Sequence, residues 1–460
     1  MVRPRMNIPR VVIAGLGSGC GKTTVSTGLM GAFASTGLRV QGFKVGPDFI
    51  DPTYHTMVTD RKSRNLDAWM LPECTIQTIF QSNVAACDIA IVEGVMGLFD
   101  GTVNSGGSTA HIAKLLGCPV ILVLDVWGMA GSAAALVAGC KALDKRLNLA
   151  GVILNRVSGE KHAAMCTSAI ESATKIPVVG AIHRDHEVKL PERHLGLVPT
   201  TEDVSLRTKL DRISGLVKSS VDLNRVLEIG KSAKPLAEAS VKRVNRRKTV
   251  RIGVAYDEAF SFYYQDALDA LSAAGAELGY FSPLHDRGLP EDFDGLYIGG
   301  GFPEVLAKEL ESNQPIRSSI KKKVEQNLPV FAECGGLMYL TRSIADFGGA
   351  QHSMVGILDC KTQMVGKLTL NYTRAAVLRD NMLSKRGTLI RGHEFHYSRL
   401  DDVPSDACFA YLMKRGSGID AGRDGWVEYG ALAQYMHMNF AAYPKLTSNF
   451  IKTCARYRRK

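Results

Sequence analysis

The segment RVVIAGLGSGCGKTT, residues 10–24, decides the fold of the first half of the chain. It joins a short apolar run to a glycine-rich loop, and a helix-compatible stretch follows. This order is typical of a phosphate-binding unit, because small residues let backbone N–H groups turn inward and the helix N-terminus adds its dipole. Lys22 is expected to reach the terminal phosphates of ATP, and Thr23 to ligate magnesium. The predicted ATP-binding residues of the loop are Gly17, Gly19, Gly21, Lys22, Thr23 and Thr24.

The loop departs from the standard spacing, which places four residues between the first glycine and the Gly-Lys pair. Five residues separate Gly15 from Gly21, and Leu16 stands at the standard first position. The strand-to-helix context and the Gly-Lys-Thr ending are kept. We therefore interpret the loop as a nucleotide site rather than a chance glycine-rich turn.

Short apolar runs alternate with helix-like segments over the first 200 residues. Continuous apolar character indicates strands buried on both faces, which is typical of a parallel sheet covered by helices. A small, polar and basic stretch then precedes a second α/β series. The sequence thus predicts an α/β fold with domains at 1–225 and 249–460 and a linker at 226–248. The expected strands are residues 10–14, 40–45, 88–93, 119–126, 150–155 and 177–181, followed by others near 250–255, 277–281, 295–298 and 329–333.

Acidic groups at strand ends would complete a magnesium site beside the phosphates. Glu93 ends the run DIAIVE, and Asp48 lies in FKVGPDFIDPTYH. We therefore predict that Thr23, Asp48 and Glu93 hold magnesium, whereas Asp51 is less favoured because Asp-Pro often starts a turn. Asn155, at the end of GVILN, either binds the nucleotide base or forms a turn.

A second reactive site is indicated by PVFAECGGLMYL, residues 329–340, which predicts a strand, a tight turn and a helix. The turn places Cys334 at a helix N-terminus, where the dipole is expected to lower the pKa of the thiol. His437, after a later apolar run, is the predicted base. Backbone N–H groups of a glycine run after another strand are expected to face an oxyanion. The predicted oxyanion and glutamine pocket consists of Gly299, Gly300, Gly301 and Gly335.

His393 and His396, in RGHEFHYS, have a spacing that suggests metal ligands. On a strand, however, residues three apart point to opposite faces, and no further ligand lies nearby in the sequence. We interpret this segment as a site wall or a domain contact rather than a zinc site.

The formal charge of +11 is concentrated in three segments without acids. Residues 1–10, 242–248 and 455–460 hold twelve of the 56 basic residues, which leaves 44 against 45 acidic ones. A nucleic-acid partner is therefore not predicted. No apolar run reaches the roughly 18 residues of a membrane span, and the start MVRPRMNIPR lacks a signal-peptide core, so we expect a cytoplasmic protein without a membrane partner.

Several separate motifs resemble the cobyrinic acid a,c-diamide synthase family, including its relative that amidates nickel-sirohydrochlorin in coenzyme F430 biosynthesis. The resemblance extends from Val11 to Tyr443. The motifs that carry it are VGPDFIDPTYH (45–55), VEGVMGLFDG (92–101), LPERHLGL (190–197), DEAFSFYYQDAL (257–268), GGGFPE (299–304), AECGGLMYL (332–340) and GHEFHYS (392–398).

The resemblance implies a dethiobiotin-synthetase-like ATP domain, which accounts for the loop spacing, followed by a class I glutamine amidotransferase domain. It makes Cys334 the nucleophile, activated by His437. Many amidotransferases of this class carry glutamate two residues after the histidine, where this chain has Asn439, so a Cys-His dyad is the prediction. The implied substrates are ATP, glutamine and a tetrapyrrole polycarboxylate, and a homodimer is the implied assembly. The residues implied near the substrate carboxylate are Asp48, Phe49, Ile50 and Asp100.

Three substrates remain compatible with the sequence: cobyrinate, nickel-sirohydrochlorin and hydrogenobyrinate. Cobyric acid synthase shares the architecture but modifies other side chains, and it is the nearest alternative. A P-loop ATPase acting as a non-enzymatic scaffold is the alternative from another class. It would leave Cys334, the glycine run and His437 without a purpose.

Overall fold

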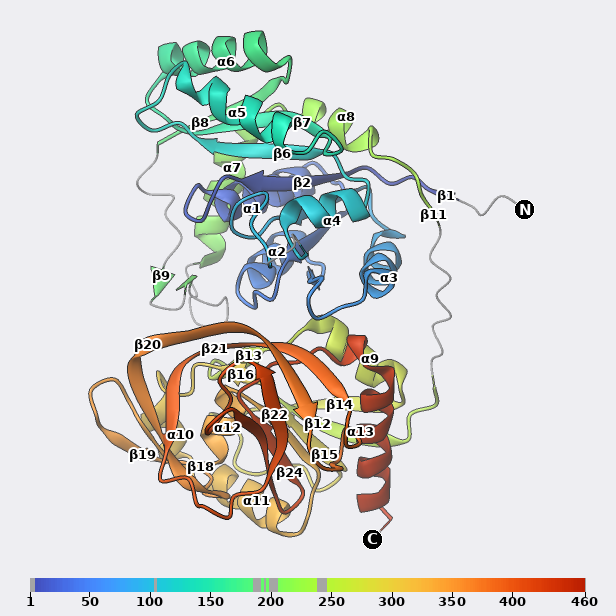
Figure 1. The fold of residues 1–460 in the computed structure, drawn as a ribbon, viewed down its shortest axis with the longest axis vertical. Helices are drawn as coiled ribbons and strands as arrows, with labels where there is room; N and C mark the ends of the chain where they lie inside the picture. Colours follow the sequence, from blue (N-terminus) through green and yellow to red (C-terminus); the bar gives the residue numbers. More distant parts are fainter. Residues whose placement is uncertain are drawn as a thin grey trace. The chain divides into compact units, whose positions relative to one another are not determined.

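The computed structural model of the chain describes residues 5–102, 106–184, 192–193, 196–197, 206–237 and 246–459 (Figure 1). The chain divides into an N-terminal unit, Met1–Val241, and a C-terminal unit, Lys242–Lys460. Each unit has a large sheet and a hydrophobic core of its own. Of the motif LPERHLGL, the structure describes only the backbone of Glu192–Arg193 and Gly196–Leu197.

The N-terminal unit is built on a seven-stranded parallel sheet with the order β4-β3-β5-β2-β6-β7-β8. Its strands are β2 (Arg10–Gly15), β3 (Val40–Val45), β4 (Arg64–Leu66), β5 (Ile89–Glu93), β6 (Val120–Asp125), β7 (Leu149–Val157) and β8 (Val178–His183). The predicted parallel α/β sheet is confirmed, and β4 is an additional edge strand. The chain continues from β2 to one side of the sheet and later returns to the other, so β2 marks the point where ligands bind in open α/β sheets.

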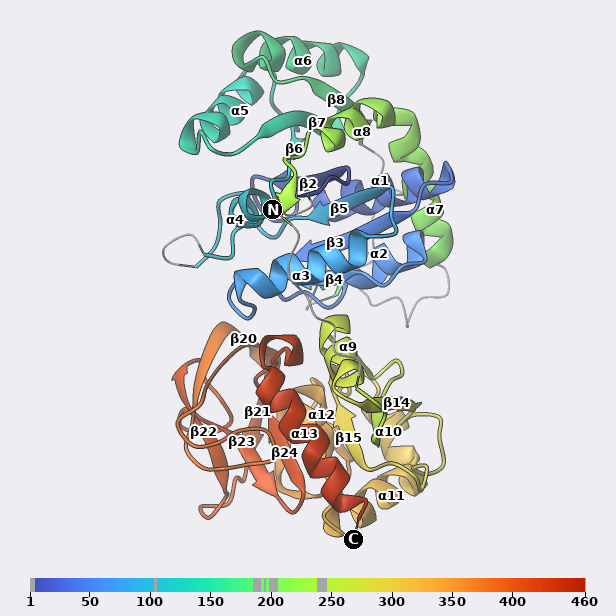
Figure 2. The same ribbon diagram turned by 90° about the vertical axis from the view of Figure 1, so that its right-hand side faces the viewer.

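Helices cover this sheet on both faces (Figures 1 and 2). They are α1 (Lys22–Ser35), α2 (Asp51–Thr59), α3 (Glu73–Val84), α4 (Thr109–Leu115), α5 (Ser132–Leu143), α6 (Glu160–Thr174), α7 (Leu206–Ser220) and α8 (Leu223–Lys231). Apolar residues of α1, α7 and α8 share one core cluster with β2, which holds the helix of the phosphate loop against the central strand. Two short pairs complete the unit: β1 (Arg5–Met6) with β11 (Leu236–Ala237), and β9 (Glu192–Arg193) with β10 (Gly196–Leu197).

The expected linker at 226–248 differs from the structure in its first part. Helix α8 continues to Lys231, and Leu236 and Ala237 form β11. Val226 and Ile229 are buried in the core of the N-terminal unit, because they lie on one face of α8 among polar neighbours. The N-terminal unit therefore extends well beyond residue 225, where the sequence placed its end.

The C-terminal unit contains an eleven-stranded mixed sheet. Five neighbouring strands are parallel: β14 (Ala276–Phe281), β12 (Val250–Ala255), β15 (Gly295–Ile298), β17 (Val330–Glu333) and β24 (Ala431–Gln434). The sheet continues through β23 (Arg423–Glu428), β22 (Phe409–Arg415), β20 (Leu358–Val377), β21 (Leu389–Asp401), β18 (Thr341–Ala345) and β19 (Gln351–Ser353). The long antiparallel part, absent from the sequence expectation, brings β21 to the end of β24.

The remaining elements of this unit surround the ends of the parallel strands. They are the small pair β13 (Phe260–Phe262) and β16 (Gly300–Gly301), with α9 (Gln265–Ala273), α10 (Ala307–Ser312), α11 (Gln314–Glu325), α12 (Gly335–Leu340), the 3-10 helix η1 (Phe440–Ala442) and α13 (Pro444–Tyr457). Among the residues that the structure describes, no helix combines the length and the apolar character needed to span a membrane.

Candidate active sites

The phosphate loop lies between β2 and α1, as the sequence predicts. Gly21 has φ 96°, and a Cβ atom there would lie 2.2 Å from Nδ2 of Asn155, so only glycine fits. A Cβ atom at Gly17 or Gly19 would meet no described heavy atom within 4 Å, so the loop is open on that side. The Lys22 ammonium folds back onto its own loop and donates to the Gly17 carbonyl at 2.6 Å. Phosphate oxygens would compete for this ammonium.

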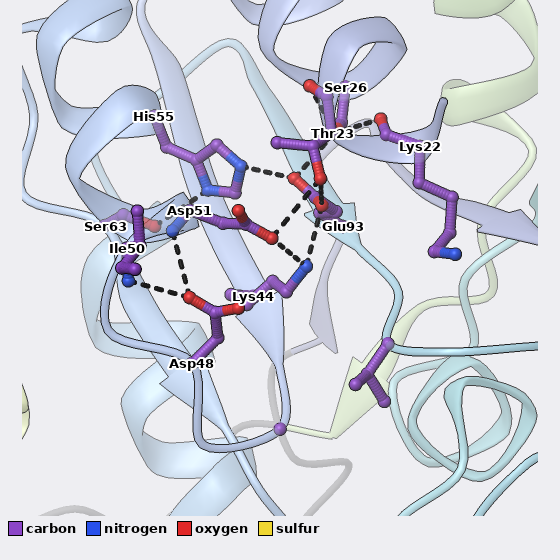
Figure 3. A network of polar contacts seen from close by, with 12 residues as sticks. Lys22, Thr23, Ser26, Lys44, Asp48, Ile50, Asp51, His55, Ser63 and Glu93 are labelled. Carbon is purple, nitrogen blue, oxygen red and sulfur yellow. Dashed lines mark hydrogen bonds and ion pairs between the residues drawn. The ribbon is translucent and has the colours of Figure 1, made fainter. Parts of the chain in front are cut away.

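Glu93 is the centre of a buried polar network at the end of β5 (Figure 3). One carboxylate oxygen, Oε1, accepts from Thr23 Oγ1 at 2.6 Å and from Lys44 Nζ at 2.7 Å. The other, Oε2, bonds to Ser26 Oγ and to His55 Nε2, both at 2.7 Å. One carboxylate therefore connects β5 to the loop helix α1, to β3 and to α2.

The charges of this network balance one another inside the protein. Burial alone would raise the pKa of Glu93, but Lys44 and His55 hold that pKa well below its usual value. Burial would lower the pKa of Lys44, but Asp51 and Glu93 raise it. Burial and the neighbouring Asp48 raise the pKa of Asp51, although Lys44 opposes this. Lys44 therefore keeps its positive charge between the carboxyl groups of Asp51 and Glu93.

Of the predicted magnesium ligands, Thr23 and Glu93 are hydrogen-bonded to each other, whereas Asp48 binds backbone N–H groups. Asp48 Oδ1 accepts from the N–H groups of Ile50 and Asp51, at 2.7 and 3.0 Å, and so shapes the start of α2. Asp51, not Asp48, lies within hydrogen-bond range of Thr23, with Oδ2 at 3.3 Å from Oγ1. Among the described residues no group of three His, Cys, Asp or Glu side chains encloses a metal site. Magnesium commonly takes one or two carboxylates and completes its shell with water and phosphate, so Thr23 with Asp51 and Glu93 fits that chemistry.

Asn155 contacts the phosphate loop directly, and Asp100 shapes a turn that is bonded to the loop. Nδ2 of Asn155 donates to the carbonyl of Cys20 at 2.9 Å, which fixes the loop rather than leaving the amide open. Oδ2 of Asp100 accepts from the N–H of Gly97 at 2.8 Å, and Leu98 N donates to the carbonyl of Gly15 at 2.7 Å. The turn of the VEGVMGLFDG motif therefore lies against the loop.

Cys334 occupies the predicted elbow between β17 and α12. Its backbone has φ 48° and ψ −101°, a conformation that costs free energy for any residue with a side chain. The N–H of Cys334 donates to the carbonyl of Gln434 at 2.7 Å, which ties the elbow to the end of β24. The side chain is nearly buried.

His437 follows β24 and lies against Gly300. A Cβ atom at Gly300 would lie 2.6 Å from Cε1 of His437, and one at Gly335 would lie 3.4 Å from the carbonyl carbon of Gly300. Gly300 therefore contacts both the base and the residue that follows Cys334. This close approach requires glycine at position 300.

The electrostatics of the pair correct one expectation. Burial raises the pKa of the Cys334 thiol well above its usual value, and Glu304 adds to this effect, while the N–H of Gly335 opposes it. The lowered pKa expected from a helix N-terminus is not found, because α12 has only six residues and the thiol is buried. Burial, with His393 and His396 nearby, lowers the pKa of His437 well below its usual value. These shifts favour an uncharged thiol at Cys334 and an uncharged imidazole at His437.

The glycine run is held close to this pair, but its N–H groups are not equivalent. The N–H of Gly299 donates to the hydroxyl of Tyr263 at 2.8 Å. Gly300 and Gly301 form β16, which pairs with β13. Oxyanion binding is thus better matched by the residues nearer Cys334 than by Gly299.

His393 and His396 form a wall of this site, and neither belongs to a metal cluster within the described residues. His393 stacks on His437 with ring centroids 4.8 Å apart and planes at 15°. His396 stacks on Tyr435 with centroids 3.9 Å apart. The hydroxyl of Tyr264 lies 2.5 Å from Nε2 of His393. Asn439 instead caps η1, accepting from Ala441 N at 2.9 Å.

Sequence reasoning did not identify Lys44, His55 or Glu333. Lys44 carried a usable signal, since a charged residue inside an apolar run of a buried strand requires a partner. His55 lies on α2 and Glu333 ends β17, and their contacts come from segments distant in the sequence. Nothing in the local pattern indicates those partners.

Comparison with known proteins identifies a domain family for each half of the chain. Residues 11–198 match the CobQ/CobB/MinD/ParA nucleotide binding domain, and residues 251–445 match the CobB/CobQ-like glutamine amidotransferase domain. The chain thus belongs to the class of proteins that join a nucleotide-binding domain to a glutamine amidotransferase domain.

Relatives named cobyrinate a,c-diamide synthase match almost the whole chain. The protein of Dehalococcoides mccartyi strain CBDB1 is 46% identical and covers 97% of this chain and 98% of its own length. Those of Caldanaerobacter subterraneus subsp. tengcongensis and Methanobrevibacter smithii are each 44% identical, covering 98% and 96% of this chain and 99% and 98% of their own lengths. The chain is a member of the cobyrinate a,c-diamide synthase family.

Proposed function

We propose that this protein uses ATP and glutamine to convert the a and c acetate carboxylates of a tetrapyrrole into amides, with cobyrinate as the substrate. The name shared by its relatives supports cobyrinate. The observation that carries the proposal is that Gly300 contacts both His437 and Gly335, the residue directly after Cys334, in a chain that also holds a phosphate loop. A scaffold ATPase has no use for this arrangement.

The N-terminal unit would activate the carboxylate, which is a poor electrophile. The carboxylate oxygen attacks the γ-phosphorus of ATP, the bond to the β-phosphate oxygen breaks, and an acyl phosphate and ADP result. Lys22 and the loop N–H groups would stabilise the charge on the transferring group. Magnesium, held by Thr23 with Asp51 and Glu93, would neutralise phosphate charge when bound.

The C-terminal unit would release ammonia from glutamine. As Sγ of Cys334 attacks the amide carbon, its proton passes to His437, which the neutral state of that imidazole permits. The oxyanion is stabilised by backbone N–H groups of the glycine run. The carbon–nitrogen bond then breaks, His437 returns the proton to the departing ammonia, and water hydrolyses the thioester to glutamate.

Ammonia completes the reaction by attacking the acyl phosphate, which gives the amide and inorganic phosphate. A nitrogen source inside the enzyme is needed because free ammonia in neutral solution is mostly ammonium, which is not nucleophilic. We place Asp48, Phe49, Ile50 and Asp100 near the substrate carboxylate and Asn155 near the nucleotide. We also propose a homodimer, which light scattering after size-exclusion chromatography would check.

The test compares the parent with Cys334→Ala, using glutamine or ammonium chloride as nitrogen source. Cys334→Ala should lose glutamine-dependent amidation of cobyrinate and glutamate release, yet keep ammonium-dependent amidation. Glutamate release by this variant at the parent rate would remove Cys334 from its role. Parallel assays with nickel-sirohydrochlorin, hydrogenobyrinate and an a,c-diamide substrate decide the acceptor, since turnover of the last would favour cobyric acid synthase chemistry.

A further inference from the structure

Glu333 is a buried carboxylate that the proposed chemistry does not use. It ends β17, directly before Cys334, and only 2% of it is exposed. Its Oε1 accepts from the N–H of Met438 at 2.8 Å, and its Oε2 accepts from the hydroxyl of Tyr297 at 2.7 Å. Met438 is the residue directly after His437. One side chain therefore lies next to the nucleophile in sequence and is bonded to the neighbour of the base.

The segment that carries His437 is held residue by residue. The carboxylate of Asp424 accepts from the N–H groups of Tyr435 and Met436, at 3.0 and 3.1 Å. The backbones of His437 and His393 exchange two hydrogen bonds, at 2.8 and 3.0 Å. Glu333 fixes the next N–H, that of Met438. The imidazole thus belongs to a segment with little freedom to shift.

Of these supports, the one from Glu333 joins the strand before Cys334 to the residue after His437. Asp424 and His393 belong to the antiparallel part of the sheet, on β23 and β21. Glu333 instead belongs to the strand that delivers Cys334. Its hydrogen bond joins the nucleophile strand to the far side of His437, where Asn439 is engaged in capping η1.

We propose that Glu333 is a positioning residue, which holds His437 at the distance from Cys334 that proton transfer requires by binding the N–H of Met438. The inference rests on the proposed glutaminase activity. A carboxylate is a costly choice for a simple packing role, since burial raises the pKa of Glu333 to about 8 and so disfavours its charge. An apolar residue at position 333 could not accept a hydrogen bond from the N–H of Met438.

The test compares two substitutions of nearly equal size. Glu333→Gln keeps an oxygen acceptor for Met438, whereas Glu333→Met keeps the length and removes the acceptor. In the full-length protein, Glu333→Met should lower kcat for glutamate release by roughly 10- to 100-fold with KM for glutamine unchanged, because small displacements of reacting groups cost rate. Glu333→Gln should stay within about threefold of the parent. The exposed Glu325→Met serves as the matched control.

A purely structural role would give a different pattern. Glu333→Met leaves the N–H of Met438 and the hydroxyl of Tyr297 without their acceptor, so its melting temperature should fall, and a purely structural role would leave kcat of the folded fraction at the parent value. The inference is overturned if Glu333→Met keeps the parent kcat, if Glu333→Gln is as impaired as Glu333→Met, or if only KM changes. If Glu333→Met does not fold, Glu333→Gln decides alone: kcat near that of the parent supports the role, and a 10-fold or larger loss overturns it.

The two proposals fail in distinguishable ways. Glutamate release that survives in Cys334→Ala would overturn both. Loss of activity in Cys334→Ala together with unchanged kcat in Glu333→Met would leave the proposed function standing and overturn the positioning role alone.

Discussion

The two units bury carboxylates in opposite ways. In the N-terminal unit, the carboxylate of Glu93 is matched by the ammonium of Lys44, which holds the pKa of Glu93 well below its usual value, so ionic charge is kept inside the protein. In the C-terminal unit, Glu333 and Asp424 are held mainly by backbone N–H groups, and burial raises their pKa to about 8 and about 7. The first arrangement suits a site that must manage phosphate charge. The second fixes the backbone around a pair that reacts from its neutral state.

Glu93→Gln is expected to have the largest effect, because it removes the negative charge at the centre of the N-terminal network. The amide supplies one oxygen where the carboxylate supplies two, so it cannot satisfy Thr23 and Lys44 on one side and Ser26 and His55 on the other. We expect ammonium-dependent amidation to fall by about 1000-fold, and stability by about 3–5 kcal/mol because Lys44 loses a buried partner.

Initial rates with saturating ammonium chloride and urea titrations measure these two effects. Glu73→Gln is the matched control, because Glu73 is exposed and pairs only with His111 among the described residues. Amidation by Glu93→Gln within tenfold of the parent would show that the paired charges are not needed for the chemistry.

A second experiment uses pH to separate the two kinds of burial. Because the folded state raises the pKa of Asp424 to about 7 and that of Glu333 to about 8, it holds their protons at pH values where the unfolded chain has lost them. The free energy of unfolding of the C-terminal unit should therefore decrease as the pH rises from about 4 to 8, on the order of 2–4 kcal/mol for each group. Asp424→Asn should flatten this decrease, although it also loses an acceptor for a backbone N–H.

Trp426 reports on this unit because it is buried in β23. Urea titrations at several pH values, in a background with Trp69 and Trp127 changed to Phe, would follow its fluorescence. The exposed Asp406→Asn is the control. A slope with pH that is the same in Asp424→Asn and in the control would contradict the assignment.

The smallest effect is expected at His393. This residue supports His437 by ring stacking, without a charged group. His393→Phe keeps a ring to stack on His437 but loses the bond with Tyr264, so kcat for glutamate release should fall about two- to threefold. His393→Ala loses both contacts and should lower kcat by about tenfold. The exposed His285→Ala is the control, and equal rates for all three variants would remove His393 from the site.

Local patterns were sufficient to predict both reactive turns. The apolar run before Gly15 and the Gly-Lys-Thr ending specify β2, the loop and α1, and PVFAECGGLMYL specifies β17, the elbow and α12. In each case the strand, turn and helix are neighbours in sequence, so propensity and turn chemistry carry the information. Strands of the parallel sheets were found for the same reason.

The partners of the reactive residues could not be predicted, because they depend on register between distant strands. Glu93 is joined to Lys44 by the pairing of β3 with β5, and Glu333 reaches Met438 through the pairing of β17 with β24. The raised pKa of the Cys334 thiol was also missed, since burial outweighs the dipole of a single short helix. The end of the N-terminal unit was misplaced because the second part of α8 was grouped with the small, polar and basic stretch that follows it, although its apolar residues have helical spacing.

At position 334, stability and the proposed chemistry favour different residues. At φ 48° and ψ −101° a glycine would relax the chain, so the substitution that most eases folding there also deletes the thiol. Substitution of Cys334 by glycine would therefore give a more stable protein that lacks the proposed glutaminase activity. A cysteine at this strained position therefore indicates selection for the function of its thiol rather than for stability.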